Sequence, residues 1–494
     1  MGIRNGVKDW LMREGRSVKE KITLVFHTSC VRFQDDDLEY LEKTGLPWCV
    51  PDNVRVELAL LVQNGREYGA NTFSRRAQRI LDNARAWELQ GCIGASDPWD
   101  LEQLYIDQGK RFSMDRELFA GMSLLFLFGD RYKMYEFLEH SRDLRGHHVL
   151  VLKEEEWACS GGRVASLEKE HGKLRSWARG FWSGRECTGV DLRQRSCTAE
   201  ELRRVKSYDC RGHSRPGGLG IPIRMLGEQL GKGTYAVICR SNHALSGDMV
   251  KVFMEWDMTG NGVGKIRSLM SGAEGVAHLP LAMPQRMLMS SDWPNRVLGY
   301  TMKELEGSPA NGIALRGDWP DEVEPGLILR RIGALLVEVH VRSMLVNDLS
   351  YHNVLVSDRG RVGFVDCDSF QSREYVGGPM TPIYRHRDLT EEDCEKRLRK
   401  PIHEYFSFTV LLYQLIMGVI DPLNMVKQEI GIPRTWSNTS FPLDWDTRSS
   451  DNVGKEILQR WVKQDETTRR LFADVFHFRR SPSIGAILRD LGLV

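Results

Sequence analysis

The chain of 494 residues is too long for one ordinary domain, so two or three domains are expected, each with its own core. Its 68 Lys and Arg residues nearly balance its 67 Asp and Glu residues, and the net charge of +1 excludes a global field that would draw the protein to nucleic acid or to an anionic membrane. Any polyanionic partner must therefore be met locally.

The cysteines and the apolar runs indicate in which cellular compartment the protein is expected. The ten cysteines are unevenly spaced and no basic-then-apolar signal segment opens the chain, so free thiols in a reducing cytoplasm are expected. The longest apolar runs, at 122–128 and 406–420, are shorter than the roughly 20 residues that a spanning helix needs. We therefore expect no membrane partner.

The first 155 residues alternate between strand-like and helix-like segments. ITLVF at 22–26 has the pattern of a buried strand, a polar helix-like stretch runs to Tyr40, and a turn at Pro51 leads into an apolar helix. Two further short strands are predicted at 124–130 and 147–152, with a helix between them. This alternation predicts an α/β domain with a mostly parallel sheet over residues 1–155.

Segment 21–152 resembles the PIN-like nuclease fold through TLVFHTSC, VPDNVRVEL, an Asp near 107–115 and LFLFGD. The resemblance implies an acidic site at one edge of the sheet, which would hold Mg²⁺ or Mn²⁺ for phosphodiester cleavage. Its acidic positions are matched by Glu57, Asp115 (or Asp107) and Asp130, while His27 replaces the first Asp. A neutral imidazole is a poor Mg²⁺ ligand, so His27 could instead bind Mn²⁺, or the domain could only recognise RNA or a protein. The domain could also be another α/β fold, because carboxylates at sheet edges are common.

Residues 156–220 lose periodicity and gain Gly, Ser, Arg and Trp, which indicates a linker or a small module. Residues 163–215 carry 13 Lys and Arg against 7 Asp and Glu, with Trp177, Phe181 and Trp182 interleaved. This mixture could bind RNA, or it could be a solvated linker with an aromatic clamp that docks on a neighbouring domain. Four residues could ligate zinc, although only the last two have the usual tight spacing: Cys187, Cys197, Cys210 and His213.

From Ile221 the pattern predicts a β-rich lobe up to about residue 305 and an α-rich lobe over 306–494, with long apolar helices at 326–341 and 406–416. Gly231 and Gly233 lie in a turn where backbone N–H groups could approach a polyphosphate, although an ordinary hairpin also uses such glycines. Lys251 stands inside an apolar strand. Its ammonium must either reach solvent or face an anion such as phosphate.

Residues 346–370 read VNDLSYHNVLVSDRGRVGFVDCDSF and place several oxygen ligands beside two apolar strands. The strands form a predicted hairpin, which returns the chain to its start, so Asp348, Asn353 and Asp366 are expected to converge. Converging oxygens suit Mg²⁺, which takes one or two carboxylates together with substrate phosphates.

Residues 226–494 resemble the protein kinase superfamily in the order and spacing of four segments. GKGTYAVI resembles the Gly-rich loop with Ala236 in place of the third glycine, VKVF the lysine strand, VNDLSYHN the catalytic loop, and VDCD the DFG motif. More narrowly, VDCDSFQ, GYTMKELEG and EYFSFTVLLYQLIMGVIDPL are similar to a divergent group of bacterial kinase-like proteins.

This resemblance implies a bilobal α+β kinase domain that uses ATP and Mg²⁺, with Ser/Thr specificity and a regulatory or stress-response role in bacteria. Lys251 would contact the α and β phosphates, Asp348 would accept the proton of the attacking hydroxyl, and Asn353 and Asp366 would hold the metal. Asp368 would add a carboxylate near the metal, and segment 302–307, which contains Glu304, would receive adenine. The alternatives are a pseudokinase that only binds ATP, and a ribonuclease switched by the kinase-like half.

Several positions depart from the kinase pattern. Val346 and Asn347 replace the usual His-Arg pair, which argues against control through a phosphorylated activation loop. Asp388 stands where a Glu is usual, and Glu404 stands where an Asp usually opens the next helix. No clear helix glutamate is available to pair with Lys251.

Overall fold

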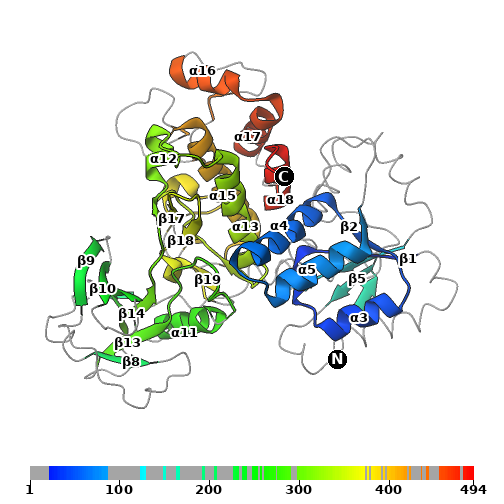
Figure 1. Ribbon diagram of the computed structural model, residues 1–494, viewed down its shortest axis with the longest axis horizontal. Coiled ribbons are helices and arrows are strands. Elements are labelled where there is room, and N and C mark those ends of the chain that lie inside the picture. The colour runs from blue at the N-terminus through cyan, green and yellow to red at the C-terminus, as the bar shows by residue number, and fades with distance from the viewer. Residues whose placement is uncertain are drawn as a thin grey trace.

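The computed structural model describes the chain in segments (Figure 1). They are residues 22–86, 123–129, 148–151, 163–166, 192–194, 205–208, 226–232, 236–241, 248–253, 256–258, 261–273, 275–290, 297–372, 375–377, 380–390, 393–394, 398–419, 422–423, 436, 441–443, 455–478 and 482–494. None of the helices in these segments has the length and apolar character required to cross a bilayer.

The N-terminal half is built on one sheet of mostly parallel strands. Its strands are β1 (Ile22–Phe26), β2 (Trp48–Val50), β3 (Ala84–Ala86), β4 (Ser123–Leu127), β5 (His148–Val151) and β6 (Arg163–Ser166). They lie in the order β3-β2-β1-β4-β5-β6, all neighbours being parallel except β5 and β6. The central strand β1 is apolar and its residues from Leu24 to Phe26 are buried, as expected for a strand covered on both faces. The predicted mostly parallel sheet is confirmed.

The helical elements that accompany this sheet are η1 (Thr28–Arg32), α3 (Asp35–Lys43), α4 (Asp52–Tyr68) and α5 (Thr72–Asn83). Helix α4 begins directly after Pro51, as the sequence predicts. Two stripes of α4 are buried, an apolar one that includes Val54, Leu58 and Leu61 and a more polar one that includes Asn53, Glu57 and Asn64. A helix buried on two sides lies between two layers of a protein.

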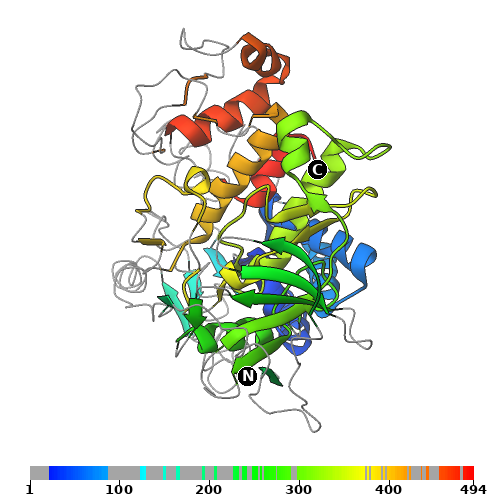
Figure 2. The same cartoon turned by 90° about the vertical axis from the view of Figure 1, so that its left-hand side faces the viewer.

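The β-rich lobe is an antiparallel sheet of eight described strands: β7 (Leu192–Gln194), β8 (Val205–Tyr208), β9 (Leu226–Lys232), β10 (Ala236–Ser241), β11 (Asp248–Phe253), β12 (Trp256–Met258), β13 (Arg286–Ser290) and β14 (Val297–Lys303). Six run in the order β7-β12-β14-β11-β10-β9, and β13 pairs with both β14 and β8. Helix α11 (Asn261–Ala273) lies beside this sheet (Figures 1 and 2).

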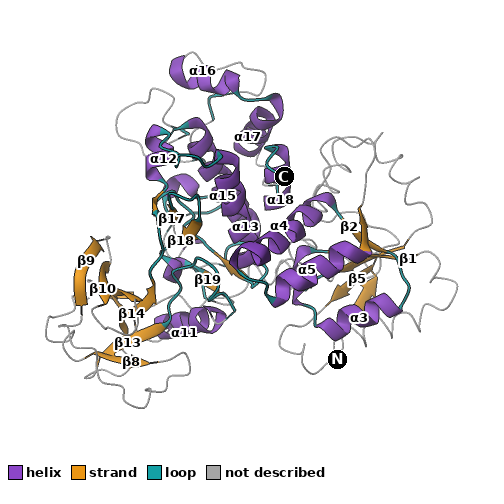
Figure 3. Ribbon diagram, viewed as in Figure 1, coloured by secondary structure: helices purple, strands orange, loops and turns teal. Residues whose placement is uncertain are grey.

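The α-rich lobe follows directly. Its helical elements are α12 (Asn311–Arg316), α13 (Pro325–His340), η4 (Cys367–Ser369), η5 (Pro382–Tyr384), α15 (Pro401–Met417), α16 (Lys455–Lys463), α17 (Glu466–Phe478) and α18 (Ile484–Asp490), and its short strands are β15 (Ser308–Pro309), β16 (Met344–Leu345), β17 (Val354–Val356), β18 (Val362–Phe364) and β19 (Gln371–Ser372). Helices α13 and α15 each have proline at the first position, where its missing N–H costs nothing. The β-then-α order of the C-terminal half is present (Figure 3).

The described parts of residues 156–220 belong to the two sheets. Strand β6 pairs with β5 in the N-terminal half, whereas β7 pairs with β12 and β8 pairs with β13 in the β-rich lobe. The predicted boundaries at 155 and 220 stay predictions. The aromatic residues and the zinc candidates of this region, Trp177, Phe181, Trp182, Cys187, Cys197, Cys210 and His213, lie outside the described residues.

The two halves contact each other through the polar stripe of α4. Asn64 Nδ2 donates to the carbonyl oxygen of Ala334 in α13 at 3.0 Å, and Asn53 Nδ2 donates to Ser483 Oγ, the N-cap of α18, at 3.1 Å. All these polar groups are buried. Helix α4 is therefore packed between its own sheet and the α-rich lobe, as Figure 1 shows.

Candidate active site

Lys251 lies in the middle of the antiparallel sheet and points toward the α-rich lobe. Strand β11 runs between β10 and β14, and Lys251 pairs with Tyr300 of β14. Its side chain is buried, and its ammonium donates to Asp366 and, at 2.7 Å, to Asp368 Oδ1. The ammonium therefore faces two carboxylates, and the alternative that it snorkels to solvent is wrong.

Asp366 and Asp368 belong to the turn that follows β18. Asp366 has a left-handed backbone with φ of 60°, and η4 begins directly after it. The hydroxyl of Tyr300 donates to Asp368 Oδ1 at 2.6 Å, so this carboxylate has a second fixed partner. Asp368 is thereby held against the β-rich lobe.

The pKa values of Lys251, Asp366 and Asp368 depend on burial and on the charges of the other two residues. Burial opposes the charge of Lys251, but Asp368 and Asp366 outweigh burial and raise the pKa of the lysine. Burial also disfavours a charged Asp368, yet Lys251 and Tyr300 keep the pKa of this carboxyl below its usual range. At Asp366 burial prevails, and the pKa is raised despite Lys251. Asp368 is thus the better charge partner for Lys251.

The loop from Asp348 to Asn353 is tied to the same place. Asn353 Nδ2 donates to the carbonyl oxygen of Asp348 at 2.9 Å and to its Oδ2 at 3.0 Å. The hairpin of β17 and β18 pairs Val354 with Phe364, and Val365 N donates to the Asn353 carbonyl oxygen at 3.0 Å. The hairpin therefore places Asn353 next to Asp366, and these bonds bring the predicted loop together.

Two groups outside the loop hold Asp348 and the residues that precede it. The backbone N–H of Thr381 donates to Asp348 Oδ1 at 2.9 Å. Glu404, in the first turn of α15, accepts the N–H of Val346 with both carboxylate oxygens, at 2.9 and 3.0 Å. The glutamate is buried, and it anchors the chain two residues before Asp348.

The predicted phosphate-loop and adenine residues are only partly placed. Gly231 lies in β9 and Ala236 opens β10, whereas Gly233 lies outside the described residues. Glu304 follows β14 and is exposed; its carboxylate pairs with Arg240 at 2.9 Å. Its side chain is therefore engaged by a residue of strand β10.

The residues fit a Mg²⁺ ion that is shared with a phosphate. The bond from Val365 N to the Asn353 carbonyl brings Asn353 next to Asp366, and Asn353 binds Asp348 through Nδ2, which leaves its side-chain oxygen for a cation. Within the described part of the chain, no three His, Cys, Asp or Glu side chains gather closely enough to hold a metal by themselves. A Mg²⁺ ion would therefore need phosphate and water oxygens to complete its shell.

Two residues of the cluster were not expected from the sequence. Tyr300 carries a hydroxyl in an apolar strand, and this hydroxyl bonds Asp368 across the two lobes. Lys265 is a second buried ammonium near the carboxylates, on α11. For Tyr300 the available signal was a hydroxyl inside an apolar strand, but the sequence does not indicate its partner. Lys265 gave no such signal, because Arg267 and Ser268 follow it closely.

The N-terminal candidate site is described only in part, because Asp107, Asp115 and Asp130 lie outside the described residues. His27 caps η1: its Nδ1 accepts the N–H of Ser29 at 3.0 Å. Glu57 accepts the hydroxyl of Thr28 and, at 3.4 Å, the N–H of Gly485 in α18. His27 and Glu57 are thus already bonded within the protein.

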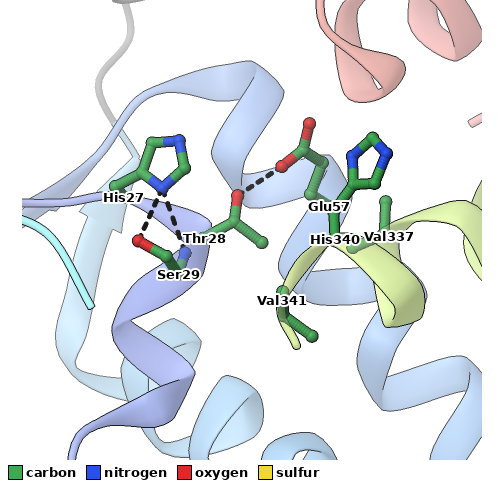
Figure 4. Close-up of a pocket in the computed structure, with 7 residues that line it drawn as sticks. All are labelled: His27, Thr28, Ser29, Glu57, Val337, His340 and Val341. Atoms are coloured by element: carbon green, nitrogen blue, oxygen red, sulfur yellow. Dashed lines mark hydrogen bonds between the residues drawn. The ribbon is translucent and has the colours of Figure 1, made fainter. Parts of the chain in front are cut away.

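A small pocket lies between these residues and α13 (Figure 4). It is lined by His27, Thr28, Ser29, Glu57, Val337, His340 and Val341, and has room for about one water molecule. The α-rich lobe therefore covers this face of the N-terminal half.

Comparisons with known proteins do not supply a family. No family model matches the chain, and no curated protein matches it. Among solved structures, it is similar to the ROP18 kinase domain in complex with AMP-PNP and sucrose, with 14% sequence identity and a TM-score of 0.34 over 58% of this chain and 84% of that chain. A likeness of this size carries no conclusion about fold or activity.

Proposed function

We propose that the C-terminal half is a kinase-like domain that binds ATP with Mg²⁺ and transfers the terminal phosphoryl group to a hydroxyl, with a protein Ser or Thr as the acceptor. The observation that carries the proposal is the convergence of Lys251, Asp348, Asn353 and Asp366, which come from separate elements in two lobes. A basic side chain opposite oxygen ligands suits a metal-bound polyphosphate.

Each residue has a definite task in this proposal. Lys251 would hold the α and β phosphates while Asp368 keeps it in position, and Asn353 and Asp366 would hold Mg²⁺, which offsets phosphate charge. Asp348 would accept the proton of the acceptor hydroxyl as its oxygen bonds the γ-phosphorus and the bond from that phosphorus to the β–γ bridging oxygen breaks. ADP is then the leaving group.

The test is phosphate transfer from labelled ATP to a generic protein acceptor or to the chain itself. Asp348→Ala should lower the rate about 100-fold or more, while ATP affinity stays near that of the unmodified protein. Asp358→Ala is the matched control, because Asp358 is an exposed carboxylate in the turn of the β17–β18 hairpin. Equal rates in the Asp348→Ala protein and the unmodified protein would overturn the assignment.

A second candidate function is ATP binding without transfer. One observation favours it: α11 reads NGVGKIRSLMSGA and has no carboxylate that could hold Lys251 from the helix. ATP binding in the unmodified protein with no labelled product on any acceptor would select this candidate. The ribonuclease alternative depends on Asp115 and Asp130, which lie outside the described residues, so no geometry favours it.

A further inference from the structure

Lys265 of α11 is a buried cation for which the described part of the chain supplies no hydrogen-bond or ion-pair partner. Its side chain is 4% exposed, and no described group forms a hydrogen bond or ion pair with its ammonium. Burying an ammonium without a partner is costly. Burial accordingly lowers the pKa of Lys265 to about 8, although Asp368 partly opposes this shift. An anion bound to the Lys265 ammonium would offset this free-energy cost of burial.

The surroundings of α11 show where this ammonium lies. One face of the helix rests on the chain that follows Asp368: Ser268 Oγ lies 2.9 Å from Ser372 Oγ, and a Cβ on Gly264 would lie 2.5 Å from the Tyr375 hydroxyl. Lys265 precedes Ser268 by three residues and so lies on the same side of the helix. The negative charges of Asp368 and Asp366 attract its ammonium.

These two carboxylates are already bonded by another cation. Lys251 donates to both of them, and Tyr300 donates to Asp368 as well. Lys265 therefore adds a second positive charge to a cluster whose acceptors are engaged. A polyphosphate brings several further anionic oxygens, and the Lys265 ammonium can donate charge-assisted hydrogen bonds to them.

We propose that Lys265 is a second phosphate-binding residue of the nucleotide site, which contacts a phosphate oxygen of ATP that Lys251 does not hold. The proposal rests on the proposed nucleotide-binding function, because the site is the same. It gives α11 a direct contact with the substrate in place of the carboxylate that would hold Lys251.

The test compares Lys265→Met with Arg267→Met in the full chain. Arg267 is exposed on the same helix, so its replacement controls for lost charge on α11. Calorimetry with ATP and with adenosine should show ATP affinity about 10-fold or more weaker in Lys265→Met, with adenosine affinity unchanged and both affinities unchanged in Arg267→Met. Lys265→Arg, which keeps the charge, should recover part of the ATP affinity.

The outcomes separate this inference from the proposed function. Equal ATP affinity in Lys265→Met and the unmodified protein overturns the role of Lys265 and leaves the proposed function standing. Equal loss of ATP and adenosine affinity also overturns it, because a phosphate contact cannot affect adenosine. Absence of ATP binding in the unmodified protein overturns the proposed function itself. Melting without nucleotide shows whether Lys265→Met folds, and Lys265→Gln repeats the comparison if it does not.

Discussion

Asp368 explains how Lys251 can be held without a glutamate from α11. The carboxylate lies two residues after Asp366, is fixed by Tyr300 from β14, and accepts Lys251 at 2.7 Å. A short turn thus supplies both the proposed metal ligand, Asp366, and the partner of the lysine. Because both roles come from one turn, the position of Lys251 does not depend on where α11 lies.

Spacing along the chain predicted part of this cluster and not the rest. Asp348, Asn353 and Asp366 are joined by one hairpin, and a local hairpin can be read from its turn residues and strand pattern. Tyr300 and Lys265 meet the cluster from the other lobe. Their approach depends on the packing of two lobes, which no local pattern encodes.

At the residue scale, Lys265 predicts a pH-dependent stability difference. Its pKa is about 8 in the folded chain against 10.5 as the ordinary value, so the folded state binds fewer protons between pH 8 and 10.5. The stability contribution of this lysine therefore rises with pH over that window, and its cost is full below pH 8. Lys265→Met should melt higher than the unmodified protein at pH 7.

The measurement is the melting temperature of both proteins from pH 7 to 10.5 without nucleotide. The advantage of Lys265→Met should shrink as the pH rises, because neutral lysine carries no charge to bury. The charged groups that act on Lys265 are Asp368, Arg399, Asp366 and Lys251, and they are the same in both proteins. A constant difference across this range would contradict the lowered pKa.

At the element scale, the β17–β18 hairpin is the part that carries the site, and its turn depends on Gly360. This glycine has φ of +68°, and a Cβ there would lie 2.5 Å from Val323 Cγ1. Gly360→Ala should destabilise the fold through left-handed strain of about 1–2 kcal/mol and through overpacking of about another 1 kcal/mol or more. It should also displace Asn353 and Asp366, and so lower phosphate transfer.

Gly317→Ala is the control for Gly360→Ala. Gly317 has φ of +71°, but a Cβ there would meet nothing within 4 Å, so only the backbone strain remains. Urea unfolding should rank Gly360→Ala as clearly less stable than Gly317→Ala. Equal losses in the two proteins would mean that Val323 moves away freely and that the turn is not packed as described.

Element positions were the easier part of the fold to predict. Helix α13 was expected at 326–341 and lies at Pro325–His340, because its apolar residues recur at helical spacing after a proline start. The pairing of β6, β7 and β8 was not expected. Each of these strands has only three or four residues, and their hydrogen-bond partners are set by the sheets they join.

At the scale of the whole molecule, α13 connects the two halves. It packs against α4 at Asn64, and its last residue, His340, lies in the pocket opposite Glu57. His340 Nε2 is 3.4 Å from Glu404 Oε2, and Glu404 anchors Val346 at the start of the loop that contains Asp348. A continuous chain of contacts thus leads from the N-terminal half to Asp348.

This contact could not be predicted from the sequence. Asn53 and Ser483 are 430 residues apart, and the stripe of α4 that faces the α-rich lobe is polar. Polar side chains such as Asn53 and Asn64 usually lie on the solvent face of an amphipathic helix, and Glu57 was predicted as a metal-site carboxylate and not as an interface residue. In the structure they are buried because each finds a partner across the interface or on η1.

The same contact predicts that the two halves unfold together, and Gly485 tests this. In α18, a Cβ on Gly485 would overlap the carbonyl oxygen of Asn53 and lie 3.1 Å from Glu57 Cγ. Gly485→Val should push α18 off α4, at a cost of about 1–3 kcal/mol, and leave Asn53 without its bond to Ser483. Calorimetry should then show a lower melting temperature and two separate transitions instead of one.

Gly492→Ala is the control for Gly485→Val. Gly492 has φ of +63°, and a Cβ there would have no atom within 4 Å, so this change strains the end of the same segment but should keep one transition. If Gly485→Val melted in one step at the temperature of the unmodified protein, α4 and α18 would not hold the halves together.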